Sequence, residues 1–372
     1  MHLTPWSRRA LVAALALSLA AAACSGGDDK ETAKPTTTVK RTTTTQPAPA
    51  APLTGIPQPD GGKLSRPALI VKIDSTPKGV AVQEGIDKSD LVFVEQTEQG
   101  TIRLAAVFQS RDATVGPVRS ARTSDVHIAS TLNHPLLAYS GANSGVLRQV
   151  RGAPLVDVGI DARGVTSIYT RNQRGGTRNL YRFFLPTADM YAARGGEGGT
   201  PPSIFRYRAK GLISAGEAVL GVRVGYGGGA ATVVSYEWDG NGWARAQNGR
   251  PHVMAGGGAR ISPENVVVLI TPYRSSGYRD VTGAVSPEAV LEGSGDAWFF
   301  ADGKVVRGRW VRPGPNAPYT FTAPDGTVPL LTPGQTFIEL APGPGSATIV
   351  PKPVPTTTTT VARSTTSQPR KR

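Results

Sequence analysis

The sequence predicts an α/β domain with a mixed sheet and helices, followed by a mainly antiparallel β domain, between chain ends that form no core. Within residues 60–200, apolar strand-like runs alternate with helix-like segments, which is the pattern of an α/β domain. From about residue 213 the apolar runs are short, β-rich and separated by Gly, Pro, Asn and Asp, as in antiparallel sheets. Glycine and proline make up 75 of 372 residues, above the ~12% of average usage, so turns and tails are abundant.

In the first half, a continuous apolar run that ends at Asp74 indicates a buried strand. The glycine-containing connection 96–102 reads as a hairpin-like turn between two further strands. The predicted order is strand 68–74, strand 90–95, strand 103–109, helix 120–132, strand 135–139, helix 145–150 and helix 187–194.

In the second half, Asp-Gly pairs at 239–240, 302–303 and 325–326 are strong hairpin signals. The predicted strands are 218–224, 231–238, 266–270, 297–300, 308–311 and 336–340. A glycine-rich stretch at 195–203 marks the domain boundary. The predicted organisation is a signal peptide at 1–23, a disordered Thr/Pro-rich tether at 24–52, an α/β domain at 53–205, a β-rich domain at 206–345 and a disordered basic tail at 346–372.

The first 24 residues indicate export. Arg8 and Arg9 precede a short apolar run that is too short to span a bilayer, and small residues lead into Cys24, which is the single cysteine of the chain. This order is typical of a bacterial lipoprotein signal, in which the cysteine thiol receives diacylglycerol and the cysteine becomes the new N-terminus. Ala21 stands where leucine is usual. We therefore expect a lipid-anchored protein on the extracytoplasmic face of the cell membrane; the alternative is an ordinary secretory signal with an incidental cysteine.

The net charge of +14 is confined to a few segments. The tail 351–372 carries five basic residues and no acidic one, and residues 171–210 carry eight basic residues against two acidic ones, so the rest of the folded part is close to neutral. An exported protein meets no chromosome, and we expect no nucleic-acid partner. The basic tail can instead attract anionic envelope polymer or lipid headgroups.

The sharpest local feature is the run Gly-Pro-Val-Arg-Ser-Ala-Arg at 116–122. Arg119 and Arg122, at the start of a predicted helix, can converge on one anion with bidentate guanidinium contacts, and Ser120 lies between them. Arg103 on the preceding strand and Arg178 in the basic segment can join them. The alternative is that Arg119 and Arg122 pair internally, for example with Asp74, Asp125 or Glu95.

The acidic residues near strand ends offer a second chemistry, because ligands bind at strand ends in α/β sheets. Asp74, Asp90, Glu95 and Asp125 can position a metal ion, act as a base, or simply pair with arginine. The histidines that follow the signal, at positions 127, 134 and 252, have no metal-binding spacing. We therefore expect no resident metal and no cofactor.

Three runs of the first half resemble one known family: RPALIVKID at 66–74, DLVFVEQTEQGTIRLAAVFQS at 90–110 and GPVRSAR at 116–122. Three runs of the second half match it too: ENVVVLITPY at 264–273, GSGDAWFFADGKVVRGRW at 293–310 and LLTPGQTFIEL at 330–340. Over about 53–342 the chain resembles the YerB-like bacterial lipoproteins, whose two halves are the N- and C-terminal domains of unknown function 3048. The resemblance implies an envelope location and no established chemistry.

The family pattern falls on twelve residues of this chain: Asp74, Asp90, Glu95, Arg103, Gly116, Pro117, Arg119, Ser120, Arg122, Arg178, Asn179 and Tyr181. Two departures stand out. Ser75 replaces the Asn that usually follows the strand-end Asp, and Thr-Arg-Asn at 177–179 replaces the common Pro-His-Asn. The resemblance therefore implies no histidine-dependent activity at that point.

Three functional hypotheses follow. The first is binding of an anionic envelope polymer or lipid precursor by Arg103, Arg119, Ser120, Arg122, Arg178, Asn179, Asp74 and Asp125, without catalysis. The second is phosphoryl or glycosyl-phosphate transfer on envelope polymer precursors, in which Asp74 or Asp125 holds Mg²⁺ or takes a proton. The third is a non-enzymatic scaffold for other envelope proteins.

Overall fold

A mixed sheet of 15 strands runs through the part of the chain that the computed structural model describes, which is residues 48–59, 61–172, 179–209, 211–228 and 231–353. These residues belong to one unit of the chain, residues 47–372. Residues 1–47, which include Cys24 and most of the predicted tether, and residues 354–372 of the predicted tail lie outside the described residues. In the described parts of these two segments, Ala51 is buried and Ala347–Pro351 form the strand β22. In the described residues, no helix is long and apolar enough to cross a membrane.

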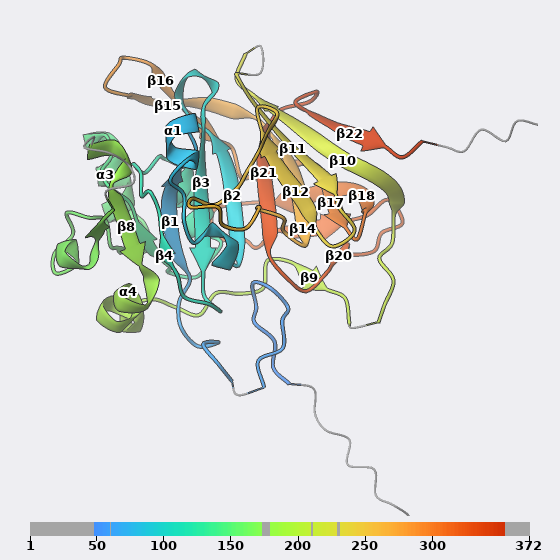
Figure 1. The fold of residues 1–372 in the computed structure, drawn as a ribbon, viewed down its shortest axis with the longest axis horizontal. Helices are drawn as coiled ribbons and strands as arrows, with labels where there is room; N and C mark the ends of the chain where they lie inside the picture. The colour runs from blue at the N-terminus through green and yellow to red at the C-terminus, as the bar shows by residue number, and fades with distance from the viewer. Residues whose placement is uncertain (1–47, 60, 173–178, 210, 229–230, 354–372) are drawn as a thin grey trace, which may run out of the picture. The chain divides into compact units, whose positions relative to one another are not determined.

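The first half of the chain builds one end of this sheet (Figure 1). Its strands are β1 (Leu69–Asp74), β2 (Leu91–Gln96), β3 (Ile102–Phe108), β5 (Leu136–Ala138) and β6 (Val156–Asp157). β3 lies antiparallel between β1 and β2, while β5 and β6 continue in parallel on the other side of β1. Both faces are covered, which explains why these strands read as unbroken apolar runs.

The second half continues the sheet in the order β13-β12-β11-β10-β18-β17-β14-β21, with β19 beside β18 and β22 beside β10. Its strands are β10 (Glu217–Tyr226), β11 (Thr232–Trp238), β12 (Trp243–Gln247), β13 (Arg250–Pro251), β14 (Asn265–Thr271), β17 (Gly293–Ala301), β18 (Lys304–Arg312), β19 (Thr320–Thr322), β21 (Thr336–Pro342) and β22 (Ala347–Pro351).

Smaller elements surround the sheet. Three small sheets pair β15 (Tyr273–Arg279) with β16 (Val285–Ala289), β9 (Arg206–Tyr207) with β20 (Leu330–Leu331), and β8 (Phe183–Pro186) with β4 (Thr114–Val115) and β7 (Thr170–Arg171). The helices are α1 (Pro77–Val80), α2 (Ser124–Ala129), α3 (Ser144–Gly152) and α4 (Thr187–Arg194), with 3-10 turns η1 (Ile86–Lys88), η2 (Glu98–Gly100), η3 (Thr166–Ile168), η5 (Asn179–Tyr181) and η6 (Gly195–Glu197).

The predicted fold class is confirmed, but one predicted helix begins later than expected. The helix expected over 120–132 is α2, which begins only at Ser124. The preceding residues are hydrogen-bonded to strand and loop backbone instead: the Arg119 N–H donates to the Lys72 carbonyl at 2.8 Å, and the Ala121 N–H donates to the Gly141 carbonyl at 3.0 Å. These contacts hold 119–121 extended between β1 and the loop after β5, so the helix cannot begin earlier.

The two halves share one core because β21 lies between them. It pairs in parallel with β14 of its own half and with β2 of the other half, so that Phe337 is opposite both Val266 and Val92. Nearly all side chains of β21 and β2 are buried. The sheet therefore has no free edge at the junction of the halves.

A buried polar network on one face of the sheet also crosses the junction. Glu339 of β21 is fully buried and accepts hydrogen bonds of 2.5 Å from the hydroxyls of Tyr226 and Tyr236. Arg245 Nε donates to the Tyr236 hydroxyl at 3.1 Å, which places a positive charge near the Glu339 carboxylate. Burial raises the pKa of Glu339, whereas Arg245 and the two tyrosines oppose that effect.

Two further contacts of this network reach the first half. The buried His252 ring lies between Arg245 and the side chain of Gln83, and the Gln83 amide in turn donates to the carbonyl of Asp74. Burial, together with the charge of Arg245, keeps the pKa of His252 well below its usual range, so the ring is neutral. A second bridge joins Ser75 and Gln247, whose side chains are 2.9 Å apart.

We predict that the first half does not fold alone. In a fragment of residues 53–205, β2 would lose its parallel partner β21 and expose the hydrogen-bonding edge of its buried segment, which includes Val92 and Val94. We expect the fragment to show no cooperative unfolding in urea. From Cys24 onward every tryptophan lies in the second half, so in that chain tryptophan fluorescence reports on that half alone, while far-UV circular dichroism reports on both.

For the chain from Cys24 onward we therefore expect the two probes to give one coincident transition. Two separated transitions, or a sharp transition of the fragment 53–205, would show that the halves are independent folding units.

Candidate functional site

A row of charged side chains crosses three adjacent strands at one end of the sheet. In the β-ladder, Asp74 at the end of β1 is directly opposite Arg103 on β3, and Arg103 is directly opposite Glu95 on β2. Directly opposed residues of antiparallel strands have Cβ atoms about 4.5–5.5 Å apart, so these side chains stand together on one face. Asp74 and Glu95 are fully buried and Arg103 is nearly so.

Behind this row lies an inner group made of Lys72, Glu95 and Asp125, and all three are fully buried. Lys72 precedes Asp74 by two residues on β1 and therefore points to the same face. Its ammonium donates to Glu95 Oε1 and lies 2.7 Å from Asp125 Oδ1 on α2. One cation thus holds two carboxylates together in the core.

In front of the row lies an outer group made of Arg103, Arg119 and Arg122 with the carboxylates of Asp74 and Glu98. Arg119 Nε donates to Asp74 Oδ2 at 2.6 Å. The segment that carries Arg119 is tied to β1, because the Asp74 N–H donates to the Pro117 carbonyl at 3.0 Å. Thr76 also donates to Asp74 through its N–H, at 2.7 Å, and through its hydroxyl.

Arg122 and Glu98 form the second pair of the outer group, with two parallel hydrogen bonds. Arg122 Nε is 2.8 Å from Glu98 Oε1, and Arg122 Nη2 is 2.7 Å from Oε2. Glu98 lies on η2 after β2 and also accepts a hydrogen bond from Ser286 of the second half. Burial alone would raise the pKa of Glu98, but the hydrogen bonds and charge of Arg122 lower it, so this carboxylate stays ionised.

Arg103 is the least satisfied member of the outer group. Its Nη2 is 3.6 Å from Asp74 Oδ2, which is beyond hydrogen-bond distance. Its Nη1 donates to the carbonyl of the neighbouring Ile102 at 3.1 Å, and its Nε is buried without a hydrogen-bond partner among the described residues. Burial lowers the pKa of Arg103; the charge of Asp74 opposes this, whereas Arg119 and Arg122 reinforce it. Three guanidinium groups are therefore close enough to repel one another.

The charges of the two groups do not balance locally. The outer group has three arginines against two carboxylates, Asp74 and Glu98, a surplus of one positive charge. The inner group has Lys72 against Glu95 and Asp125, a surplus of one negative charge when both carboxylates are ionised. The two surpluses compensate each other only in that fully ionised state.

Asp125 can remove that compensation by taking up a proton. Burial, reinforced by the charge of Glu95 and opposed by Lys72, raises its pKa to about 7. Its Oδ2 accepts the Arg122 N–H at 2.7 Å, which links the inner group to the outer one. When Asp125 is protonated, the positive surplus of the outer group is left without a counter-charge inside the fold.

The structure corrects part of the predicted site. Of the two interpretations of Arg119 and Arg122, the structure shows internal pairing: Arg119 pairs with Asp74, one of the expected carboxylates, and Arg122 pairs with Glu98, which was not expected. A buried carboxylate requires such a partner. Arg119 and Arg122 also do not lie at the start of a helix as predicted, because α2 begins after them at Ser124 and Asp125 accepts the Arg122 N–H.

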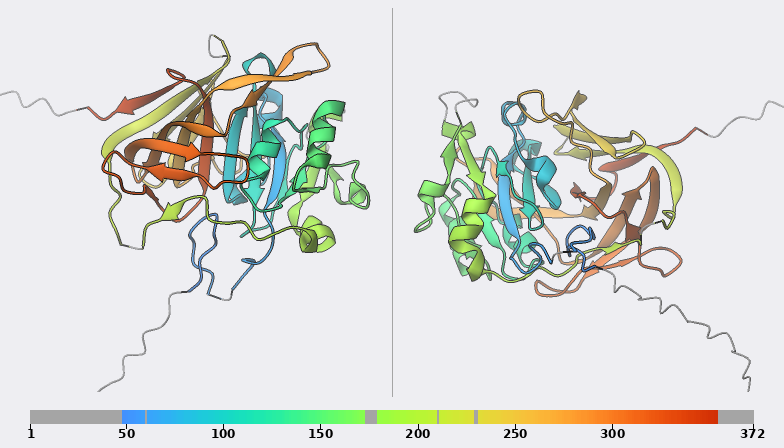
Figure 2. Two further views of the ribbon diagram at one scale, coloured as in Figure 1. Left: turned by 180° about the vertical axis from the view of Figure 1, so that it is seen from behind. Right: turned by 60° about the horizontal axis from the view of Figure 1, so that its bottom comes forward.

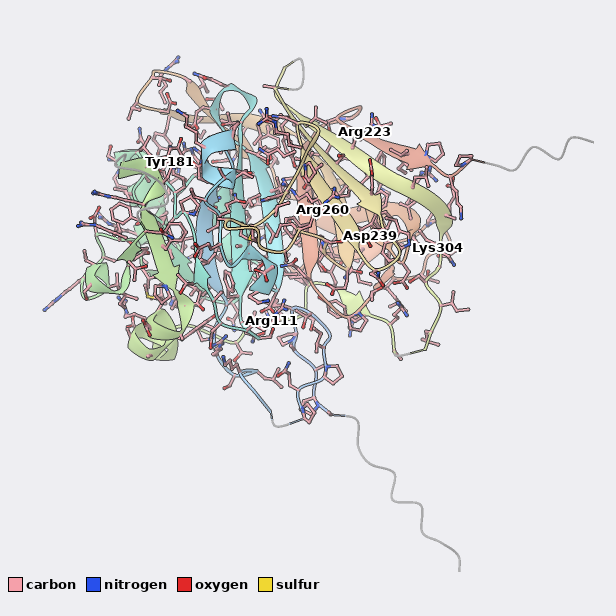
Figure 3. The ribbon with its side chains drawn as sticks, viewed as in Figure 1. Arg111, Tyr181, Arg223, Asp239, Arg260 and Lys304 are labelled. Carbon is pink, nitrogen blue, oxygen red and sulfur yellow. The ribbon has the colours of Figure 1, made fainter. Side chains whose placement is uncertain are left out.

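The remaining predicted residues divide into two sets. Ser120, between the two arginines in sequence, is half-buried. The ring of Tyr181, a residue labelled in Figure 3, has its centroid 5.9 Å from the Arg119 guanidinium carbon, a cation–π arrangement. Asn179 begins the turn η5 that carries Tyr181. Arg178 lies outside the described residues, so the structure does not place it with the other three arginines.

Two members of the site were missed by sequence reasoning. Lys72 lies inside a run that predicts a buried strand, and a lysine is almost never fully buried unless it is paired. That signal alone could have indicated a buried carboxylate partner on another element. Glu98 lies in the connection after β2, and no local pattern distinguishes it from a solvated turn residue.

No metal site is evident in the described part of the chain, since it contains no group of three or more His, Cys, Asp and Glu side chains arranged to hold an ion. Asp74 and Asp125, the two candidate metal ligands, are occupied by arginine and lysine. Pairing with a cation explains their positions better than coordination does.

We predict that Asp125→Asn changes the pH dependence of stability. The pKa of Asp125 is about 7 in the folded chain and its ordinary value is 3.8, so between these values the folded state binds more protons than the unfolded state. The free energy of unfolding contributed by this group therefore falls as pH rises from about 4 to about 7. Asparagine cannot ionise, so the variant should gain stability relative to the wild type over that interval.

Urea denaturation at several pH values between about 4 and about 7.5 measures this difference, and subtraction of the two curves cancels the other titrating groups. A difference in unfolding free energy that stays constant with pH would contradict the assignment.

Known proteins share this architecture. The sequence model described as "Protein of unknown function (DUF3048) N-terminal domain" matches residues 53–194, and that described as "Protein of unknown function (DUF3048) C-terminal domain" matches residues 222–338. No curated protein matches the chain. The crystal structure of the YerB protein from Bacillus subtilis has the same fold, with a TM-score of 0.67 at 22% sequence identity, over 81% of this chain and 99% of that chain. The resemblance inferred from sequence is confirmed, and the chain belongs to the YerB-like DUF3048 family.

Proposed function

We propose that the chain is a lipid-anchored protein of the extracytoplasmic face of the cell membrane that binds one anionic group of an envelope polymer or lipid precursor at its outer group of arginines. One observation carries the proposal: Arg103 is a buried cation whose guanidinium reaches Asp74 only at 3.6 Å, beyond hydrogen-bond distance, and whose Nε has no hydrogen-bond partner in the described residues. An unsatisfied buried cation is costly, and an anion in contact with it would supply the missing interactions.

A phosphate-type anion fits the outer group best. The surplus is a single positive charge, which matches one ionised phosphate ester, and guanidinium groups bind phosphate oxygens in bidentate fashion. The side chains of Arg103, Arg119 and Arg122 are 8%, 17% and 13% exposed, so the group is shielded from water but still reachable. Shielding strengthens a charged contact because it lowers the local dielectric constant.

Space for a larger ligand lies beside the outer group. The Ser140 N–H donates to the Arg119 carbonyl at 3.0 Å, and Ser140 lines a cavity of about 440 Å³ together with residues of the neighbouring loops. Arg171 and Asp161 also line that cavity. A polymer or lipid precursor whose phosphate contacts the arginines could place its next unit in this cavity.

The transferase hypothesis has less support. It needs Asp74 or Asp125 to hold Mg²⁺ or to accept a proton from a substrate. Asp74 is held by Arg119 and Thr76. Burial raises the pKa of Asp74, but Arg103, Thr76 and Arg119 together lower it by more, so the net pKa is below its ordinary value and Asp74 is a weak base. Asp125 is fully buried behind Lys72. We therefore propose binding rather than group transfer.

We predict that inorganic pyrophosphate, used as the probe, binds the mature chain and raises its melting temperature at low ionic strength. The test uses Cys24→Ser, which removes the proposed lipid attachment. Replacing Arg103 by Met should weaken pyrophosphate binding about 10- to 100-fold, because a charge-assisted hydrogen bond is worth about 1.5–3 kcal/mol. Calorimetric titration measures the affinity.

The matched control is Arg307→Met, which removes an exposed arginine paired with Glu217 and should leave the affinity unchanged. Arg103→Met should keep the fold, because Asp74 still has Arg119 as its partner. By contrast, Arg119→Met removes the closest cation of Asp74 and should lower the free energy of unfolding by about 3–5 kcal/mol. If the Arg103 and Arg307 variants bind pyrophosphate with equal affinity, or if the chain gives no heat of binding, the proposal is wrong and the arginines of the outer group serve only as internal ion pairs.

We predict that membrane attachment depends on Cys24. The wild-type chain, expressed in its bacterial host, should sediment with membranes and enter the detergent phase on Triton X-114 partition, because an attached diacylglycerol and acyl chains provide the anchor. Cys24→Ser should move most of the protein to the aqueous phase. Retention of both proteins in the detergent phase would rule out anchoring through this residue.

A further inference from the structure

A second cavity, of about 490 Å³, is enclosed by loops from both halves of the chain. These four loops are the turn after α2 (130–134), the turn after α3 (at 154), the end of the connection from α4 to β9 (202–204) and the loop before β19 (316–319). The α4–β9 connection, yellow-green in the left view of Figure 2, runs beneath the sheet from the first half to the second. We call this space the four-loop cavity; its volume lies in the range of small-molecule sites, about 300–1,000 Å³.

The hydroxyl of Tyr319 is the clearest sign that the four-loop cavity lacks a ligand. Tyr319 lines the cavity, and its hydroxyl oxygen is buried without a hydrogen bond in the described residues. The ring is fixed in place, because it stacks on Phe321 with 5.6 Å between the centroids and meets Trp310 edge-on at 6.0 Å. A buried hydroxyl without a partner is unfavourable, and a ligand atom that completes its hydrogen bond would relieve this.

Arg312 holds two walls of the cavity and keeps its own donors occupied. It is fully buried; its Nε donates to the Ala317 carbonyl at 3.1 Å, and its Nη2 donates to the Ser130 hydroxyl at 2.6 Å. Its guanidinium carbon is 5.4 Å from the centroid of the Tyr319 ring. Burial raises the pKa of Tyr319 to about 12, although the charge of Arg312 opposes this. The Tyr319 hydroxyl therefore keeps its proton at neutral pH and can donate it to a ligand oxygen.

Three exposed polar side chains on three different loops also line the cavity, namely His134, Ser203 and Asn316. Among the described residues, none of these side chains has a hydrogen-bond or ion-pair partner. A hydroxyl, a primary amide and a neutral imidazole each offer both a donor and an acceptor. The cavity thus combines one buried and three exposed polar groups that are free to contact a ligand.

The turn that carries His134 has an uncommon backbone. Asn133 and His134 have φ values of 53° and 57°, in the left-handed region that residues other than glycine rarely adopt. The turn is held in this conformation by the α4–β9 connection, since Asn133 Nδ2 donates to the Thr200 carbonyl at 2.9 Å and the Gly199 N–H donates to the His134 carbonyl at 3.2 Å. Strained residues that the surrounding structure fixes are frequent at ligand sites.

The lining disfavours both a charged ligand and a purely apolar one. It contains no Asp, Glu, Lys or Arg, so a charged ligand would lose its hydration without meeting a counter-charge. A purely apolar ligand would leave the Tyr319 hydroxyl unsatisfied. The rest of the wall is apolar and consists largely of Pro154, Pro202, Pro318 and Ile204. An uncharged molecule with apolar faces and several hydroxyl or amide groups matches the whole lining.

A sugar unit has this chemistry, because its ring carries apolar C–H faces and a rim of hydroxyls that donate and accept. An extended peptide is the nearest alternative. Peptides of that kind gain affinity by pairing with the edge of a strand, and no residue that lines the four-loop cavity belongs to a strand. The lining therefore favours a sugar.

We infer that the four-loop cavity binds one or two uncharged sugar units of a polysaccharide, with the Tyr319 hydroxyl as the buried donor and with His134, Ser203 and Asn316 around the entrance. The inference goes beyond anion binding by the outer group and does not depend on it. None of Arg103, Arg119 and Arg122 lines this cavity.

Two uncharged disaccharides serve as probes, N,N′-diacetylchitobiose and maltose, each titrated to about 20 mM into the Cys24→Ser chain and followed by saturation-transfer NMR. We expect at least one of them to bind, with an affinity that does not change between about 0.05 and 0.5 M salt, because the ligand has no charge to screen. Tyr319→Phe should weaken this binding about 3- to 10-fold, because one hydrogen bond to the ligand is lost.

Two further variants separate binding from folding. The matched control is Tyr278→Phe, the same chemical change on β15 outside the cavity, which should leave the affinity unchanged. Ser203→Trp fills the cavity from an exposed position and should abolish binding at an unchanged melting temperature. Tyr319→Phe should not lower the melting temperature either, because it removes a buried hydroxyl that has no partner.

Four outcomes would overturn the inference: no saturation transfer from either sugar, equal affinities of the Tyr319 and Tyr278 variants, a lower melting temperature of Tyr319→Phe, or binding of blocked tetra-alanine but of neither sugar, which would identify a peptide site. Arg103→Met should leave sugar binding unchanged, and pyrophosphate should not displace the sugar. Failure of the anion proposal and failure of this inference are therefore distinguishable.

Discussion

The requirement that every buried charge be compensated organises this end of the molecule. Lys72 enters the core on β1, and its ammonium can remain there only because Glu95 and Asp125 arrive from β2 and α2. Two carboxylates on one cation leave a negative surplus, and the three arginines in front of them carry a positive one. The inner and outer groups therefore depend on each other, because protonation of Asp125 changes the balance of charge between them.

The same end of the sheet is also where the two halves of the chain meet. Gln83 contacts the Asp74 carbonyl and His252, and Ser286 of the second half reaches Glu98. These contacts supplement the parallel pairing of β2 with β21. The second half thus supports the site, which gives a physical reason for the two domains of this family to occur together in this chain.

Much of the fold could be predicted because it depends on local patterns. The apolar runs that predicted β1, β2 and β3 mark strands buried on both faces, and the Asp-Gly pair at 302–303 lies in the connection between β17 and β18. The prediction of α2 was too long, because backbone hydrogen bonds from Arg119 and Ala121 to residues distant in sequence override local helix propensity. The hairpin of β15 and β16, which supplies Ser286, was not predicted; its side chains alternate only weakly between buried and exposed.

The sequence by itself determined the family and the fold class, because these depend on composition, spacing and motif; the lipid-anchored location stays a prediction. Only the tertiary structure decided which carboxylate each arginine meets. Glu98 and Arg122 are 24 residues apart, and Asp74 and Arg119 are 45 apart. Pairing over such separations is set by strand register and by the course of the loops, and no local pattern in the chain encodes it.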